Sequence, residues 1–308
     1  MIKRILAALC AAALLALTGC APAPAASSPA GKEKLTVYAT LFPQYDFARE
    51  IAGDRAKITL LLPPGVESHS FEPTPADIAG ISKSDLLLYT GDAMEPWAAK
   101  LIAGDLPDTV RAVDLSQGVA LLAEEHEEEG HAHPFDPHIW TSPVNAMIMV
   151  RTVVSALCEA DPEGAEAYRA NGERYLAELE SLDGEIRAVV SQAKRRELVF
   201  GGRFAFHYFT AEYGLTAYSA YDSCSEETEP SAKAVSEVIG RVREDHLPAV
   251  YYEELTDPKV ARSIAQETGA KLLLLHSCHN LSKDELAAGE SYLSLMKRNA
   301  QNLREGLN

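Results

Sequence analysis

The sequence predicts an α/β protein with two lobes of parallel-type sheets flanked by helices, joined by one long rigid helix. Short apolar strands alternate with helical segments in the first half of the chain, and the second half repeats this alternation after a long helical stretch. Strands that alternate with helices at such spacing form βα units with a parallel sheet. A chain of 308 residues is long enough for two domains of ordinary size.

The first half contains four predicted strands, and the residues between them have helical patterns. Thr74 is a typical N-cap and Pro75 suits the first helical position, so a helix is expected to start there. The predicted strands are residues 35–40, 57–62, 86–89 and 111–115, and the predicted helices are residues 42–51, 75–83 and 96–102.

The second half contains four further strands with the same kind of connection. Gly214 is expected to close a helix as a left-handed cap. The predicted strands are residues 198–200, 216–221, 249–253 and 271–275, and the predicted helices are residues 204–213, 231–244, 258–268 and 286–303.

A long helical stretch separates the halves. A helix starts at Ser142-Pro143, Asp161-Pro162 interrupts it, and residues 163–194 continue at helical spacing. About 30 residues of helix span roughly 45 Å, enough to lie along both lobes and set their relative angle. The alternative is a helical hairpin broken near Gly184. We therefore divide the folded chain into an N-terminal lobe (35–160), a linking helix (161–195) and a C-terminal lobe (196–308).

The composition is globular and acidic. Apolar residues make up 47% of the chain and charged residues 24%, and the formal net charge is −17. This negative net charge argues against nucleic acid and anionic membrane surfaces as partners.

The N-terminus has the pattern of an export signal. Lys3 and Arg4 precede an apolar stretch, residues 5–17, that is too short to span a bilayer as a mature helix. Residues 17–20 (LTGC) resemble the bacterial lipobox, which implies cleavage after residue 19 and lipid attachment at Cys20. The alternative is an ordinary signal peptide with an incidental cysteine. Residues 20–34, rich in Ala, Pro and Ser, are expected to be a flexible tether outside the cytoplasm.

Three cysteines remain in the expected folded part. Cys158 lies on a predicted amphipathic helix, as a small core residue does. Cys224 and Cys278 lie in loops after strands, and we expect them to form a disulfide because disulfides persist outside the cytoplasm. The alternative is that one of these two binds a metal.

Histidines lie at positions typical of ligands. His69 follows a strand that ends in Pro-Pro-Gly, and His138 lies in a loop held by Pro134 and Pro137. Ligand sites in α/β sheets gather at the carboxyl ends of strands, and imidazole is the commonest metal ligand at neutral pH. For each histidine alone, a hydrogen-bonded structural role is the alternative.

Two segments carry a family resemblance. Residues 68–75 (SHSFEPTP) and 136–143 (DPHIWTSP) resemble the signature motifs of the substrate-binding lipoproteins of zinc and manganese ABC transporters, cluster A-I. The resemblance covers nearly the whole mature chain. It implies two (βα)-type lobes joined by a long rigid helix, a metal bound in the cleft between them by His69 and His138, and a cognate ABC permease as partner.

The resemblance places the other two ligands in the second lobe. The third family ligand is a His or Glu, but the matching position holds Arg203, which cannot bind a cation. His207 lies one helical turn later and is expected to replace that ligand. The fourth position follows a late strand, where we favour His276 over His279 because it abuts that strand. Four nitrogens favour Zn²⁺ over Mn²⁺, and a closed tetrahedron argues against catalysis.

An acidic histidine segment precedes His138. Residues 124–133 (EEHEEEGHAH) are expected to form a charged surface loop. Its histidines could gather zinc weakly near the cleft; the alternative is a solvated loop with no specific role. The histidines concerned are His126, His131 and His133.

The leading hypothesis is an extracytoplasmic monomer that captures Zn²⁺ and delivers it to an ABC permease. A manganese-binding member of the same family is an alternative. A membrane-anchored zinc hydrolase is another; it would need an open zinc position and a base such as Glu67, Glu72 or Glu253, and the sequence has no His-Glu-x-x-His motif. An adhesin is a third, with no surface that the sequence identifies.

Overall fold

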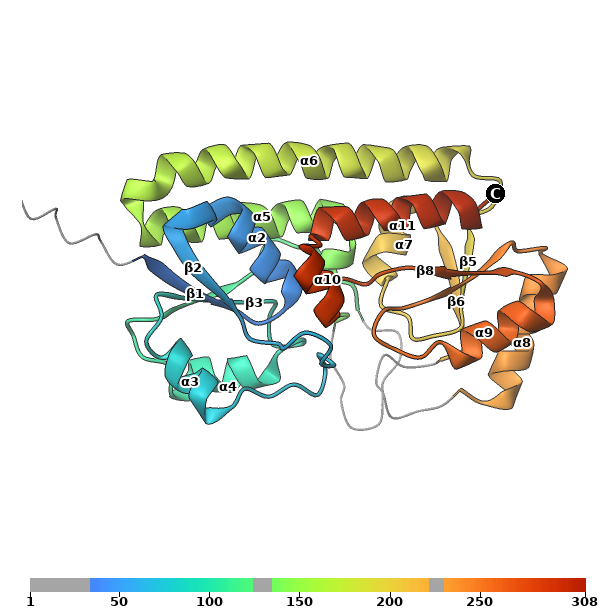
Figure 1. The fold of residues 1–308 in the computed structure, drawn as a ribbon, viewed down its shortest axis with the longest axis horizontal. Helices are drawn as coiled ribbons and strands as arrows, with labels where there is room; N and C mark the ends of the chain where they lie inside the picture. The colour runs from blue at the N-terminus through green and yellow to red at the C-terminus, as the bar shows by residue number, and fades with distance from the viewer. Residues whose placement is uncertain (1–33, 124–134, 222–229) are drawn as a thin grey trace, which may run out of the picture. The chain divides into compact units, whose positions relative to one another are not determined.

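The computed structural model describes residues 34–123, 135–221 and 230–308. Residues Lys34–Asn308 form one unit with two four-stranded sheets, in each of which every strand pair is parallel. Helices cover the sheets, as the α/β prediction requires (Figure 1). The expected signal peptide (1–19), Cys20, the expected tether up to residue 33, the acidic histidine segment and Cys224 lie outside the described residues.

The first sheet has the strand order β2-β1-β3-β4. Thr74 caps α3 as predicted: its hydroxyl accepts a hydrogen bond from the Asp77 N–H, and the Asp77 carboxylate accepts from the Thr74 N–H. The elements are β1 (Leu35–Ala39), α2 (Phe42–Ala52), the 3₁₀ turn η1 (Gly53–Arg55), β2 (Ala56–Leu60), α3 (Pro75–Ile81), β3 (Leu86–Tyr89), α4 (Pro96–Gly104) and β4 (Arg111–Asp114).

The second sheet has the order β6-β5-β7-β8, so the halves share one topology. Gly214, at φ 62°, closes α7 in the left-handed conformation that the sequence predicts. The elements are β5 (Glu197–Phe200), α7 (His207–Tyr213), β6 (Thr216–Ser219), α8 (Ala232–Glu244), β7 (Ala249–Tyr252), α9 (Lys259–Thr268) and β8 (Lys271–Leu274).

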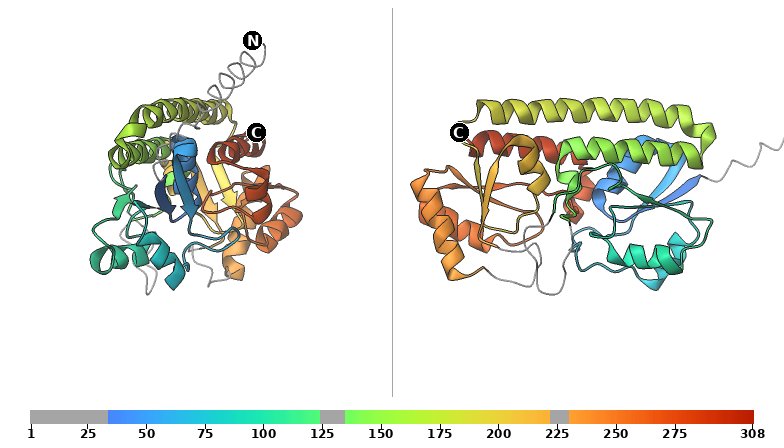
Figure 2. Two further views of the ribbon diagram at one scale, coloured as in Figure 1. Left: turned by 60° about the vertical axis from the view of Figure 1, so that its left-hand side comes forward. Right: turned by 180° about the vertical axis from the view of Figure 1, so that it is seen from behind.

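The long helix is continuous. After α5 (Pro143–Ala160) and the turn η3 (Pro162–Gly164), α6 runs unbroken over Ala165–Gln192, about 42 Å at about 1.5 Å per residue. Gly184 lies inside α6, so the hairpin alternative is wrong. Figures 1 and 2 show α6 lying along both α5 and α11 (Tyr292–Gly306). The division at residues 160 and 195 stays a prediction, since Lys34–Asn308 form one unit.

Both sheets place one face in a shared core. Leu86 and Leu88 of β3 face the core built with α2, α5 and α6, whereas Leu87 faces the smaller cluster under α3 and α4. This alternation is the two-residue period of a strand. In the second sheet Phe200 joins the shared core and Val199 packs toward α8 and α9. The shared core therefore runs continuously under both halves.

Helix α5 belongs to this core. By length and composition it is the one helix in the described ranges that could cross a membrane. Met149, Val150 and Val153 are, however, fully buried among core residues of the protein.

The prediction of a single last helix is wrong. In place of one helix over residues 286–303, the chain forms α10 (Lys283–Ala288) and α11. Gly289, at φ 75°, ends α10, and Ser291 caps α11 through its hydroxyl. The turn brings the start of α11 against the first half, where the Tyr292 N–H donates to Asp46 Oδ2 at 2.8 Å.

A buried carboxyl group at the end of the first sheet predicts a pH-dependent stability. Glu95 accepts hydrogen bonds from Thr40 Oγ1 and the Thr90 N–H, and burial raises its pKa from 4.5 to about 8 against those contacts. The folded protein therefore holds a proton that the unfolded chain releases, so stability falls as pH rises from about 4.5 to about 8.

The substitution Glu95→Gln should reduce the loss of stability between pH 4.5 and about pH 8, because glutamine does not ionise. We expect an effect on the order of a few kcal/mol, measured from urea unfolding at pH 5 and pH 8.5. Glu166→Gln, at an exposed position on α6, is the control. Equal pH slopes for the wild type and Glu95→Gln would contradict the argument.

Candidate metal site

His69 lies in the loop between β2 and α3, in a turn closed by Glu67. The Glu67 carboxylate accepts hydrogen bonds from the N–H of His69 at 3.0 Å and of Ser70 at 2.9 Å. Burial alone would raise the pKa of Glu67, but these hydrogen bonds and the charge of His69 lower it. The turn therefore holds a carboxylate whose two oxygens are occupied by the backbone that carries His69.

His138 lies directly before the 3₁₀ turn η2 (Ile139–Thr141), and Asp136 orients its ring. Oδ1 of the buried Asp136 accepts from the His138 N–H at 2.7 Å and lies 2.8 Å from His138 Nδ1. A proton on Nδ1 leaves the Nε2 lone pair for a metal, the arrangement usual for histidine ligands. His138 Nε2 lies 3.3 Å from His69 Nε2.

His279 reaches the same point from the loop between β8 and α10. Its Nδ1 contacts Ser277 Oγ, and both the hydroxyl and the N–H of Ser277 donate to the Glu254 carboxylate, at 2.5 and 2.7 Å. His279 Nε2 is buried with no hydrogen-bond partner among the described residues. A buried polar atom without a partner is costly unless a ligand satisfies it.

These three histidines form a metal-binding geometry. One ligand atom from each lies within 4.8 Å of the others, and in the described part of the chain no other His, Cys, Asp or Glu joins them. Two nitrogens of a tetrahedral zinc site lie about 3.3 Å apart at Zn–N distances of about 2.0–2.1 Å. The 3.3 Å between His69 Nε2 and His138 Nε2 therefore fits Zn²⁺.

The electrostatics favour a neutral imidazole at His279. Burial, together with the nearby charges of His138 and His69, holds the pKa of His279 well below its usual range. Burial alone would raise the pKa of Asp136, yet the charge of His138 and hydrogen bonds with His138 and His207 hold it well below its usual range. An ionised Asp136 beside neutral His279 is the protonation state that a zinc ligand set needs.

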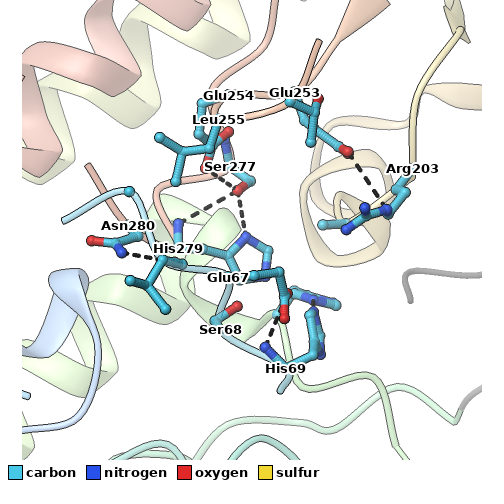
Figure 3. Close-up of a pocket in the computed structure, with 15 residues that line it drawn as sticks. Glu67, Ser68, His69, Arg203, Glu253, Glu254, Leu255, Ser277, His279 and Asn280 are labelled. Atoms are coloured by element: carbon cyan, nitrogen blue, oxygen red, sulfur yellow. Dashed lines mark hydrogen bonds and ion pairs between the residues drawn. The ribbon is translucent and has the colours of Figure 1, made fainter. Parts of the chain in front are cut away.

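The histidines open into a cavity of about 90 Å³. Figure 3 shows His69 and His279 together in it, with Glu253 and Arg203 on another side. The site therefore joins the β2–α3 loop and the segment before α5 to loops of the second sheet.

A comparison with protein families decides the assignment. The model of the periplasmic zinc-uptake complex component A, ZnuA, matches residues 37–306. The chain belongs to this zinc-uptake family. The high-affinity zinc uptake system protein of Bacillus subtilis strain 168 is 34% identical over 306 residues, which are 96% of this chain and 95% of that protein.

Two further comparisons agree with the family. The zinc-binding lipoprotein AdcA of Streptococcus pneumoniae R6 is 32% identical over 99% of this chain, and the chain spans only 60% of that longer protein. The crystal structure of the Zn(II)-bound ZnuA-like domain of Streptococcus pneumoniae AdcA superposes with a TM-score of 0.78 at 30% identity. The match covers 89% of this chain and 99% of that domain. The two-sheet fold with a long helix is thus the fold of the family.

The choice of His276 over His279 needs correction, because the structure brings His279 and not His276 to His69 and His138. His276 is fully buried, and its Nδ1 accepts from the Cys278 N–H at 3.0 Å. Its Nδ1 and Nε2 each lie 3.6 Å from a carboxylate, of Glu254 and Glu285 respectively. His276, close to the end of β8, is still buried in the core. The loop reaches the cavity three residues later, at His279.

His207 also lies apart from the three histidines. It is the first residue of α7, its side chain is 48% exposed, and its Nδ1 lies 2.5 Å from Asp136 Oδ2. The shift of one helical turn therefore brings His207 to the carboxylate that orients His138. His207 does not belong to the group of three histidines. Arg203, at the position expected of a family ligand, lines the cavity.

The expected disulfide is not formed at Cys278. This residue is a free thiol, fully buried, with φ 62°. Its partner in the prediction, Cys224, lies outside the described residues, as do His126, His131 and His133. Burial raises the pKa of the Cys278 thiol well above its usual value, so it is a poor metal ligand as well.

The sequence prediction did not include the side chains that orient the histidines, which are two carboxylates and a serine hydroxyl. Asp136 stands two residues before His138, the spacing at which an aspartate accepts a hydrogen bond from the backbone of a turn. Ser277 stands two residues before His279 in the same way. Glu254 follows a different strand, β7, so no local sequence pattern predicts its role.

Removal of the third imidazole tests the ligand set. His279→Ala should weaken zinc binding by more than about 100-fold, beyond the 10–100-fold typical of residues that only support a ligand. Competition with a chromophoric zinc chelator measures this. His246→Asn, at an exposed turn, is the control. A loss on His276→Ala as large as on His279→Ala, in protein that stays folded, would contradict the assignment.

Removal of the Asp136 charge tests how His138 is oriented. Asp136→Asn keeps the size of the side chain but cannot accept from both His138 and His207, so zinc affinity should fall about 10–100-fold. The same chelator competition measures the loss, with Asp108→Asn at an exposed loop as the control. An unchanged affinity would show that Asp136 does not support the ligand.

Proposed function

We propose that this protein captures Zn²⁺ outside the cytoplasm and delivers it to an ABC transporter permease for uptake. The observation that carries the proposal is the convergence of His69, His138 and His279, the last of which has a buried nitrogen with no hydrogen-bond partner in the described part of the chain. Membership of the zinc-uptake family supports the same reading. Zn²⁺ is the cargo, and the three imidazoles are its ligands.

The geometry suits capture because the ligands are set before the metal arrives. Asp136 directs His138, and Ser277 with Glu254 directs His279, so neither ring loses rotational freedom on binding. A neutral His279 also need not release a proton before it binds the ion. The cost of ordering the site is thus met during folding.

We propose that the site prefers Zn²⁺ to Mn²⁺. Nitrogen ligands suit zinc, whereas manganese prefers carboxylate and other oxygen ligands. The carboxylates that orient the two buried histidines, Asp136 and Glu254, are engaged with His138 and Ser277. The set offered to the ion is therefore nitrogen-rich.

The proposal includes lipidation at Cys20, which would hold the folded part near the membrane and its permease through the tether up to residue 34. The protein would act as a monomer. The histidines of the acidic segment would gather zinc weakly and pass it to the cleft. A zinc-dependent hydrolase is disfavoured, because the family serves transport rather than catalysis.

The function is tested by binding and by uptake. The purified protein should bind one Zn²⁺ tightly, and X-ray absorption should report three imidazole nitrogens at about 2.0–2.1 Å. In vesicles that contain the cognate permease, uptake of ⁶⁵Zn should require the wild-type protein and fail with His138→Ala. Equal affinity for Mn²⁺ and Zn²⁺, or uptake independent of the protein, would refute the proposal.

A further inference from the structure

Three histidines leave one zinc position open. Zinc sites in proteins are usually four-coordinate, yet in residues 34–123, 135–221 and 230–308 no fourth ligand atom of a His, Cys, Asp or Glu joins the group. Three carboxylates line the cavity: Glu253 lies 3.9 Å from Arg203, and the other two are committed elsewhere. Glu67 accepts from the backbone of its own turn, and Glu254 accepts from Ser277 with both oxygens.

A positive side chain lines the cavity onto which the histidines open. Arg203 is 17% exposed and lies 3.9 Å from Glu253 Oε1. Figure 3 shows this pair beside the cavity that also contains His69 and His279. An arginine in a cation site is unexpected, because Zn²⁺ and a guanidinium repel each other in a partly buried cavity.

We propose that the fourth zinc ligand is a small planar oxyanion of the carboxylate class, bound between the metal and Arg203. This inference rests on the proposed zinc function and extends it. One oxygen of the anion ligates the zinc, and the guanidinium holds the anion through its N–H donors. The protein thus binds zinc together with the anion. Arg203 contributes to the affinity for zinc, although it stands where a residue that binds a cation would be expected.

Size and chemistry agree with this occupant. Guanidinium carries five N–H donors in a fixed fork, so it can hold a carboxylate while it keeps Glu253 as a partner. A cavity that holds one water needs about 10–15 Å³, so about 90 Å³ admits an ion with a two- or three-carbon anion. An anion that contacts both the zinc and the guanidinium is attracted to each of them, while Glu253 offsets part of the guanidinium charge.

The test uses the full folded protein loaded with Co²⁺, whose visible spectrum reports the ligands of the metal. Acetate and bicarbonate, both planar oxyanions, are titrated separately in a buffer of weakly coordinating anions, and acetamide serves as the uncharged analogue of acetate. We expect a saturable spectral change with at least one anion and none with acetamide. Arg203→Gln should need at least tenfold more anion, and Arg203→Lys should recover part of the loss.

Arg262→Gln, an exposed residue of α9, is the matched control and should respond as the wild type does. Anion-independent spectra in the wild type, or equal anion affinity in Arg203→Gln, would overturn the inference while leaving zinc capture intact. Failure of the wild type to bind Co²⁺ or Zn²⁺ at all would instead refute the proposed function.

Discussion

The site depends on how one loop is held between the two halves of the protein. The loop after β8 carries Ser277, Cys278 and His279, and hydrogen bonds from the first half hold it. Trp140 Nε1 donates to the Ser277 carbonyl at 2.9 Å, and the Phe42 N–H donates to the His279 carbonyl at 3.4 Å. Without these bonds the third imidazole would have no defined place relative to the other two.

The residues that follow His279 also form hydrogen bonds with the first half of the protein. Asn280 Nδ2 donates to the carbonyls of Pro63 and Val66, and the Gly65 N–H donates to the Leu281 carbonyl at 2.7 Å. These contacts reach the segment that leads to His69. His69 and His279 are thus placed by one hydrogen-bonded unit, and the shared core beneath it limits movement between the halves.

Each half orients its buried histidine with a carboxylate, but by a different route. Asp136 contacts His138 directly and shares its other oxygen with His207. Glu254 acts through Ser277, and its Oε1 also lies 3.6 Å from His276. Two of the histidines that were expected to bind metal, His207 and His276, therefore lie beside the carboxylates that orient His138 and His279. The negative charge next to the imidazoles strengthens them as donors to a cation.

Local patterns in the sequence determined most of the architecture. The alternation of strands and helices, the cap at Thr74 and the left-handed Gly214 depend on neighbours a few residues away, and the structure has all three. His69 and His138 were identified because each lies within a contiguous motif. The long helix was visible for the same reason, since its helical spacing is continuous along the chain.

Only the tertiary structure decided which other histidine joins them. His276 and His279 are three residues apart, and the sequence offers both, but the positive φ of Cys278 and the bonds from Asn280 turn His279 toward the cavity. His207 was misplaced because its partner, Asp136, lies 71 residues away in the chain. Ligand geometry is a property of contacts between distant segments. A sequence lists the residues that can bind metal, and packing selects those that meet.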